Sequence, residues 1–368
     1  MHDPRSVILL TAISILGAAP VGAEQNTYIQ HNLVSSTAGA ADRQETRLVN
    51  AWGIDRSATG PWWVNAADSG LSFVYDAAGK SFPAASPLLV AVNKPDGSAS
   101  SPTGIVFNGT QEFALAPGMR AFFIFVTEDG IIAGWNPAVS ASTAIVKVNK
   151  PGEAIYKGVA LGQVAGTNYL YAANFHSGFI DVYNASFAPV TLSAHAFRDA
   201  AIPPGYAPFN VQNIGGNLAV MFAKQDEDRE DEVAGKGLGF VDIFTPAGEL
   251  VRRLHHGPWM NAPWGIALAP EDFGKFGGKL LVGNFGSGEI AAFDPESGEY
   301  RGLLKGVDHK KIAIDGLWGI GFGNGATAGP KNVLYFAAGP NDEEAGLFGT
   351  LTAAPGKGDD DDDDDDDK

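Results

Sequence analysis

Cysteine is absent from the 368 residues, so the chain has no disulfide framework, no thiolate metal site and no cysteine nucleophile. Long apolar runs are scarce too: only residues 7–19 form one, and they are too few to span a bilayer as a stable anchor. No long stretch shows a helical apolar period, and residues 270–276 are the best candidate for one helical turn. We therefore expect strand pairing and a core to hold the fold together.

Catalytic and metal-binding motifs are also lacking. The nucleophile elbow Gly-x-Ser-x-Gly does not occur. The seven histidines show no metal-ligand spacing, and the adjacent His255 and His256 would point to opposite faces of a strand. We keep one histidine as a candidate ligand-binding residue, His176 in the turn Asn174-Phe175-His176.

Basic residues are few, and the formal net charge is −17, of which residues 359–368 supply −8 through nine Asp and one Lys. An acidic chain argues against nucleic acid and anionic membrane surfaces as partners. Residues 356–368 cannot pack and are expected to form a disordered acidic tail. The tail ends in Asp-Asp-Asp-Asp-Lys, which is also a common engineered sequence, so both a natural tail and a tag stay open.

The N-terminus has the organisation of an export signal. Arg5 precedes the apolar residues 7–19, and Val21-Gly22-Ala23 places small residues before a cleavage point after Ala23. Residues 1–23 are therefore predicted to be a signal peptide, with a buried N-terminal helix or strand as the alternative. We expect a secreted or periplasmic protein without a transmembrane segment, most simply a monomer with one domain at residues 24–355.

A short phrase recurs about every 50 residues, which is the length of a propeller blade. It consists of a variable residue, a glycine, Ile or Val, and then alternating apolar positions. The copies are Trp52-Gly53-Ile54, Thr103-Gly104-Ile105, Lys157-Gly158-Val159, Trp264-Gly265-Ile266 and Trp318-Gly319-Ile320. Residues 208–211 stand where a sixth copy would fall.

Each phrase is followed by an alternating strand, a polar turn and further strands, clearest at residues 280–294. Six units of four short strands cannot bury both faces of their sheets alone, but stacking them around an axis does so. The sequence therefore predicts an all-β, six-bladed β-propeller. Residues 28–34 have strand alternation and are expected to close the last blade by pairing near residues 347–351.

These phrases resemble an uncharacterised family of exported bacterial six-bladed propellers, related to the NHL and gluconolactonase-like propellers. The resemblance covers essentially all of residues 28–353. It rests on residues 32–36, 50–54, 261–266, 284–288, 315–320, 338–342 and 346–349. It is specific for the narrow family and implies no particular activity, because propellers serve as hydrolases, isomerases and binding platforms.

Residues just before each innermost strand of a propeller line the mouth of its channel, and convergent polar groups there are the default site hypothesis. The mouth candidates are Asn50, Trp52, Asn210, Asn261, Trp264, Asp315 and Trp318. The gluconolactonase-like resemblance implies a Ca²⁺ site, for which Asn50, Asn210, Asn261 and Asp315 are the candidate ligands. No Glu stands at the first blade opening, where these relatives place a metal ligand.

Both groups of mouth residues have a structural alternative. Asn50, Asn261 and Asp315 could cap backbone groups in tight loops. The tryptophans, chosen with His176 as ligand-binding residues, could instead pack in the core. The acidic residues 226–232 and 342–344 could gather a cation or cover the channel, or form solvated loops.

The leading functional hypothesis is an exported propeller that binds a small ligand or protein partner at the channel mouth. The second is a Ca²⁺-dependent hydrolase of lactones or esters, in which the metal polarises a carbonyl and activates water. The third is a structural or adhesion module of the cell envelope. A channel packed shut by Trp52, Trp264 and Trp318 would favour the third.

Overall fold

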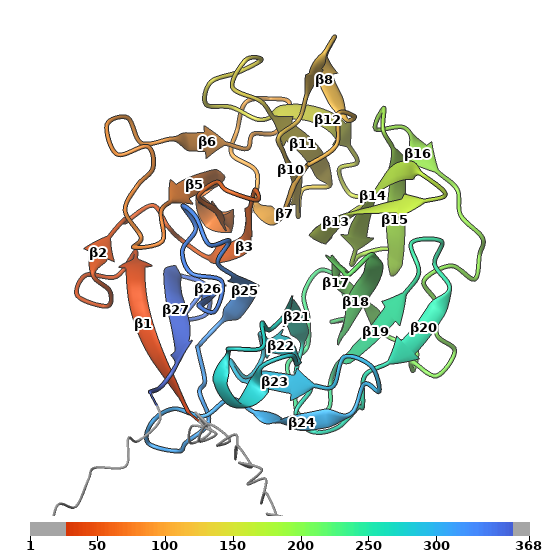
Figure 1. Ribbon diagram of the computed structural model, residues 1–368. Helices are drawn as coiled ribbons and strands as arrows, with labels where there is room; N and C mark the ends of the chain where they lie inside the picture. The colour runs from red at the N-terminus through yellow and green to blue at the C-terminus, as the bar shows by residue number, and fades with distance from the viewer. Residues whose placement is uncertain (1–26, 356–368) are drawn as a thin grey trace, which may run out of the picture.

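A computed structural model describes residues 27–355 of the chain. The predicted signal peptide at residues 1–23 and the acidic tail at residues 356–368 lie outside this range. Six sheets surround a common axis like the blades of a propeller (Figure 1). Two single-turn 3-10 helices are present, η1 (Ala67–Ser69) and η2 (Gly274–Phe276), the second inside the segment predicted as one turn. Within residues 27–355, no helix is long and apolar enough to cross a membrane.

Five blades are four-stranded antiparallel sheets whose strands run outward from the axis in chain order. Blade 1 consists of β3 (Ala51–Arg56), β4 (Trp62–Ala66), β5 (Leu71–Tyr75) and β6 (Leu89–Ala91). Blade 2 consists of β7 (Pro102–Phe107), β10 (Phe123–Thr127), β11 (Ile131–Trp135) and β12 (Ile145–Asn149). Blade 3 consists of β13 (Tyr156–Val164), β14 (Thr167–Asn174), β15 (Phe179–Asn184) and β16 (Pro189–Val190).

The next two blades repeat this plan. Blade 4 consists of β17 (Tyr206–Ile214), β18 (Asn217–Lys224), β19 (Phe240–Phe244) and β20 (Leu250–Arg253). Blade 5 consists of β21 (Pro263–Leu268), β22 (Leu280–Asn284), β23 (Ile290–Phe293) and β24 (Tyr300–Leu303). The sequence did not predict the small hairpin of β8 (Ala114–Ala116) and β9 (Met119–Arg120), which the chain inserts between β7 and β10.

Blade 6 joins the two ends of the domain. It contains β25 (Leu317–Phe322), β26 (Leu334–Ala338), β27 (Leu347–Ala353), β1 (Tyr28–Ser35) and the short β2 (Arg43–Gln44). Strand β1 pairs antiparallel with β27, from Tyr28 opposite Ala353 to Ser35 opposite Leu347. The six-bladed fold and its closure by the N-terminal strand are therefore confirmed (Figure 1).

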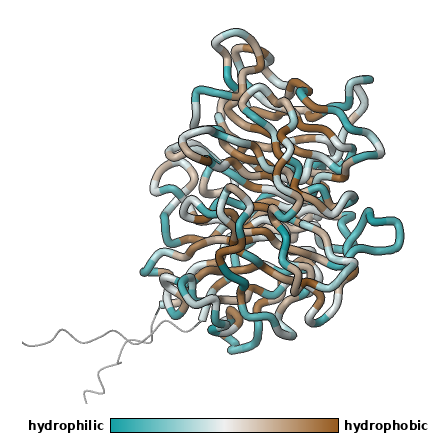
Figure 2. Tube along the Cα trace, turned by 90° about the vertical axis from the view of Figure 1, so that its right-hand side faces the viewer, coloured by the Kyte–Doolittle hydropathy of each residue, from teal (hydrophilic) through white to brown (hydrophobic). Residues whose placement is uncertain are grey.

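The core lies between neighbouring blades, where apolar side chains of adjacent sheets interlock. Between blades 1 and 2, for example, Trp63 stacks on Phe123 at 4.3 Å and packs against Trp135 at 4.9 Å between ring centroids. Hydrophobic stretches follow the strands and hydrophilic stretches follow many of the outer loops (Figure 2). Each sheet thus buries both faces, as the repeat predicts.

The recurring glycines let the innermost strands approach one another around the axis. A Cβ atom added to Gly53 would lie 2.2 Å from the carbonyl oxygen of Thr103 in the next blade. The same atom on Gly265 would lie 2.5 Å from the carbonyl oxygen of Trp318, and on Gly319 2.8 Å from that of Trp52. These contacts are too short for any side chain, so the glycine of the repeat is a requirement for closing the ring.

Candidate functional site

The residue before the repeat glycine lies close to the axis in five blades, and in blade 4 Phe209 precedes Asn210 at the equivalent position. Four of these six residues are aromatic. We call them the waist: Trp52, Phe209, Trp264 and Trp318. Trp52 and Trp318 stack with ring centroids 3.7 Å apart, and Trp264 meets them edge-on at 6.4 Å and 5.9 Å. The three tryptophans are buried, with at most 4% of their surface exposed. The structure therefore buries all three tryptophans close to the axis.

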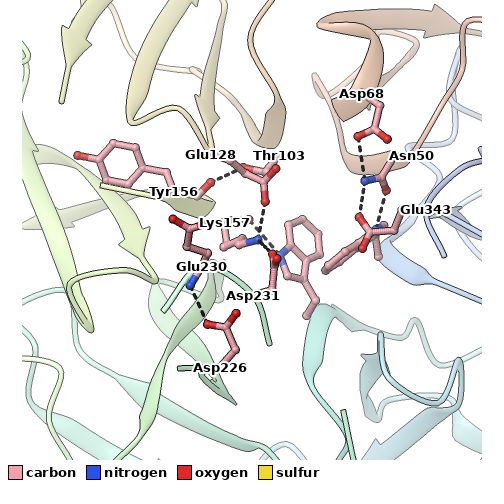
Figure 3. Close-up of polar contacts among 12 residues, drawn as sticks. Asn50, Asp68, Thr103, Glu128, Tyr156, Lys157, Asp226, Glu230, Asp231 and Glu343 are labelled. Atoms are coloured by element: carbon pink, nitrogen blue, oxygen red, sulfur yellow. Dashed lines mark hydrogen bonds and ion pairs between the residues drawn. The ribbon is translucent and has the colours of Figure 1, made fainter. Parts of the chain in front are cut away.

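Blade 3 carries Lys157 at the position where three other blades carry tryptophan. Its side chain is 1% exposed, and its Nζ atom lies 5.3 Å from the ring centroid of Trp52. Nζ donates to Glu128, and to Oδ1 of Asp231 at 3.1 Å (Figure 3). Burial alone would lower the pKa of Lys157, but the charges of Glu128, Glu232 and Asp231 outweigh it and raise this pKa. The lysine is therefore a buried cation.

Carboxylates reach the same end of the channel from four blades. Each comes from the connection between the second and third strands of its blade, and together with Asn50 and Lys157 they form what we call the mouth. The mouth carboxylates are Asp68 in blade 1, Glu128 in blade 2, Asp231 and Glu232 in blade 4, and Glu343 in blade 6. Two of these five acidic groups, those of Glu128 and Asp231, form ion pairs with Lys157.

Three of the mouth carboxylates, those of Asp68, Glu232 and Glu343, have raised pKa values. Burial raises the pKa of Glu232 to about 8, even though Glu232 keeps some exposed surface and Lys157 acts in the opposite direction. Burial likewise raises the pKa of Glu343 to about 7 and raises the pKa of Asp68. Carboxyl groups that change protonation near neutral pH are suited to proton transfer or to pairing with an incoming cation.

Asn50 connects the mouth to the waist. Its Nδ2 atom donates to Glu343, and to Asp68 at 3.4 Å, while its Oδ1 atom accepts the indole N–H of Trp318 at 3.0 Å (Figure 3). The side chain is 2% exposed. Asn50 therefore orients two mouth carboxylates with the same amide that anchors the tryptophan beneath them.

Backbone strain gathers in the loops of the mouth. Asn50 has a φ angle of 50°, and Asn341, Asp342 and Glu343 form a run with φ angles of 61°, 48° and 67°. Residues other than glycine rarely adopt this left-handed conformation, which costs on the order of 1 kcal/mol each. Such strain persists where the surrounding structure enforces it, and it concentrates at functional sites.

The four predicted calcium ligands occupy separate positions and already have hydrogen-bond partners. Oδ1 of Asn210 accepts the N–H of Val211 at 2.8 Å, and Oδ1 of Asn261 accepts the N–H of Gly235 at 2.6 Å. Asp315 is exposed, and its Oδ2 atom accepts the N–H of Asn341 at 2.8 Å.

Oδ1 of Asn50 accepts the indole N–H of Trp318. Each of the four predicted calcium ligands therefore already accepts a hydrogen bond from an N–H group with one of its oxygens. Within residues 27–355, no group of three or more His, Asp or Glu side chains is arranged to hold a metal ion. The predicted ligands therefore do not fit a calcium site as they stand. The side chains of Asn261 and Asp315 bond to backbone N–H groups, as the capping alternative describes, whereas Asn50 bonds to other side chains.

His176 lies in the connection between β14 and β15, which is blade 3's counterpart of the connections that carry the mouth carboxylates. It follows the buried Phe175, whose ring lies 6.0 Å from Nζ of Lys157. The side chain is half-buried, and its Nδ1 atom is buried without a protein partner in the described part of the chain. His176 is thus on the mouth side of the ring.

Sequence analysis missed Lys157, Asp68 and Glu128. It weighed the segments of Asp231, Glu232 and Glu343 either as loops that gather a cation or cover the channel, or as solvated loops. A signal was present in the repeat itself. Alignment of the copies places Lys157 at a tryptophan position, and a carboxylate follows the second strand of four blades. The mouth could therefore have been recognised from residues that differ between the copies of the repeat, rather than from those that the copies share.

No protein-family model matches the chain. It is 30% identical to the uncharacterised protein R648 of Acanthamoeba polyphaga mimivirus over 328 residues, which cover 87% of this chain and 78% of R648. A second mimivirus protein, the uncharacterised L690, is 29% identical over 335 residues, or 88% of this chain and 86% of L690. The chain therefore belongs to the same family as R648. Because these relatives are viral, they do not support the bacterial part of the resemblance.

Solved structures share the fold at low identity. A protein of unknown function from Bacteroides thetaiotaomicron superposes with a TM-score of 0.55 at 10% identity, covering 88% of this chain and 76% of that one. A glucose dehydrogenase superposes with a TM-score of 0.52 at 11% identity, covering 89% of this chain and 100% of that one. A streptogramin B lyase superposes with a TM-score of 0.50 at 12% identity, covering 89% of this chain and 97% of that one. At these identities the similarity shows the propeller fold alone.

Proposed function

We propose that the chain is a binding protein whose channel mouth accepts a small ligand with at least one positive charge. One observation carries the proposal: five carboxylates from four blades reach the end of the channel where Lys157 lies. Glu128 and Asp231 are paired with that lysine, whereas Asp68, Glu232 and Glu343 form no ion pair among the described residues. A basic ligand would supply the missing positive charge.

The packed waist bears on the choice between a binding protein and a structural module. A channel closed by tryptophan is the outcome that we expected to favour a structural or adhesion role. Closure at the waist, however, does not involve the charged side chains of the mouth. Glu232 and Glu343 are half-buried without an ion pair among the described residues, which is costly for a purely structural protein. The raised pKa values and the strained loop at Glu343 therefore support a binding role.

Titration calorimetry with the trication spermidine tests the proposal. We expect Glu343→Gln and Glu232→Gln each to bind about tenfold more weakly, since each removes one charge-assisted contact. Glu296→Gln, which changes an exposed turn of blade 5, is the matched control and should bind like the wild type. Equal affinities for all four proteins, or no binding of spermidine, would reject a cation-binding mouth.

A hydrolase acting on lactones or esters is the second candidate, and one observation favours it. Glu343 and Glu232, with pKa values of about 7 and about 8, are suited to general acid–base catalysis at neutral pH. The calcium-dependent form of this hypothesis stays a prediction. Its predicted ligands, Asn50, Asn210, Asn261 and Asp315, do not form a calcium site as they stand. Lactone and ester hydrolysis with added Ca²⁺ and with chelator, together with melting in both, tests it. No turnover and equal melting temperatures would exclude it.

Export, a single domain at residues 24–355 and a monomeric state also remain proposals. The composition of residues 1–23 supports export. Expression with the native N-terminus in a bacterial host, followed by mass spectrometry of the extracellular or periplasmic fraction, should give a chain that begins at Glu24. A cytoplasmic chain that retains residues 1–23 would contradict export, and light scattering of the mature protein would report its oligomeric state.

A further inference from the structure

A second recess lies on the axis, at the end of the channel opposite the mouth. The innermost strands begin at the mouth, and the second halves of most of them enclose a cavity of about 340 Å³, within the size range of small-molecule sites. Its lining includes Asp55, Ile105, Leu161, Gln212, Trp264 and Ile320. We call this space the rear cavity. Because Trp264 belongs to both the waist and this lining, the waist separates the rear cavity from the mouth.

Asp55 places an uncompensated carboxylate in the wall of the rear cavity. Oδ1 accepts the N–H of Arg56 at 2.7 Å, and Oδ2 accepts the N–H of Phe107 in the next blade at 2.6 Å. Asp55 forms no ion pair among the described residues. The guanidinium of Arg56 instead donates to the carbonyl oxygens of Phe322 at 2.7 Å and Gly323 at 3.2 Å. Burial raises the pKa of Asp55 to about 6, so the protein does not fully compensate its charge.

The structural role of Asp55 uses both carboxylate oxygens as acceptors of backbone N–H groups. Asn210 makes one of these bonds, from the N–H of the following residue to its Oδ1 atom at 2.8 Å, with a neutral amide. Asp55 is half-buried and Arg56 offsets only part of its charge, which makes this carboxylate more costly than a buried amide. The excess charge at Asp55 therefore indicates a partner that enters the cavity.

Gln212 adds a hydrogen-bonding group on the other side. It belongs to β17 of blade 4, and blade 4 stands opposite blade 1 in a ring of six. Its side-chain amide has no hydrogen-bond partner among the described residues, whereas the neighbouring Asn213 donates to the carbonyl oxygen of Leu161 at 2.9 Å. The rear cavity thus has a negative wall, an apolar lining and a polar group across the axis.

From this arrangement we propose that the rear cavity binds a small organic amine, separately from any ligand of the mouth. Its ammonium group pairs with Asp55, and its apolar body packs against Ile105, Leu161 and Ile320. A polar group at the far end of the amine hydrogen-bonds with Gln212. Only proton exchange and binding are involved, and no covalent step is required.

The probe for this site is 4-bromobenzylamine, with the isosteric 4-bromobenzyl alcohol as its neutral counterpart. Calorimetry should show the amine binding about 10- to 100-fold more tightly than the alcohol, because only the amine forms a charge-assisted bond. The anomalous signal of bromine in soaked crystals should locate the amine in the rear cavity. Equal affinity for amine and alcohol, or bromine found only at the mouth, would overturn the proposal.

Variants separate this site from the mouth. Asp55→Asn should weaken amine binding about 10- to 100-fold, and Gln212→Leu should change it less, since the probe has no polar group at its far end. Glu343→Gln should leave it unchanged while weakening spermidine at the mouth. Unchanged binding to a folded Asp55→Asn would refute the proposal. If Asp55→Asn fails to fold, the amine–alcohol comparison and the bromine position in the wild type still decide.

Discussion

The waist and the mouth lie within one side chain of each other on the axis, yet they use opposite chemistry. At the waist, Trp52 and Trp318 stack at 3.7 Å, and glycines bring the strand backbones into contact. At the mouth, Lys157 takes a tryptophan position and gathers carboxylates from neighbouring blades. Residues that recur in every blade therefore serve packing, and residues that depart from the repeat provide the candidate site. The predictions below test this division.

The largest effect is expected at the waist. Gly53→Ala places a methyl group 2.2 Å from the carbonyl oxygen of Thr103, a backbone atom that cannot move aside cheaply. We expect a loss of about 3 kcal/mol or more in the free energy of unfolding, measured by urea denaturation. Gly109→Ala is the control, because its nearest neighbour is a ring atom of Phe107 at 3.6 Å. Similar stabilities for the two variants would mean that the ring tolerates a wider spacing.

Removing the buried cation is the next largest change. Lys157→Met keeps the volume of the side chain but leaves Glu128, Asp231 and Glu232 without their counter-charge. We expect a loss of about 3 kcal/mol at pH 8 and a smaller loss at pH 5, where protonation of Glu232 removes one of the unbalanced charges.

Urea denaturation of Lys157→Met at both pH values checks this, with the exposed Lys80→Met as control. A loss that does not depend on pH would show that Lys157 contributes through packing rather than through charge.

The raised pKa of Glu232 makes the stability of the mouth pH-dependent. Its pKa rises from an ordinary value of 4.5 to about 8, so the folded state holds the proton more tightly than the unfolded state. This stabilisation is complete below about pH 4.5 and is lost as the pH rises through about 8.

Glu232→Gln should therefore become more stable relative to the wild type between those values, by about 1 kcal/mol at pH 9 after solvent screening. The difference between the two unfolding free energies, followed from pH 4 to pH 9, measures it. Glu296→Gln should show no such trend, and a difference that falls with pH would contradict the assigned pKa shift.

The smallest effect is expected at Asp315, which lies outside the mouth. It is exposed and makes one hydrogen bond, to the N–H of Asn341. Asp315→Ala should cost about 1 kcal/mol or less and should leave spermidine binding unchanged. A marked destabilisation that chelator reproduces in the wild type would instead support the calcium hypothesis.

Much of the fold was predictable because it depends on local, repeated signals. The spacing of the glycine phrases predicted six blades, and the structure has six. The alternation of residues 28–34 predicted a closing strand, and β1 confirms it by pairing with β27. The hairpin of β8 and β9 was not predicted, because its strands of three and two residues are too short to show a period. The positions of Asn50, Trp52, Trp264 and Trp318 near the axis followed from the repeat, whereas their contacts did not.

The sequence by itself determined the architecture, since one pattern repeated around an axis has only one way to bury its sheets. Only the tertiary structure decided what lies at the two ends of the channel. Asp68, Glu128, Glu232 and Glu343 are far apart in the chain, and their connections meet only when the ring closes. The raised pKa values of Asp68, Glu232 and Glu343 arise from burial in that arrangement, as does the raised pKa of Asp55 in the rear cavity. Burial depends on neighbours from other blades, so no local pattern could reveal it.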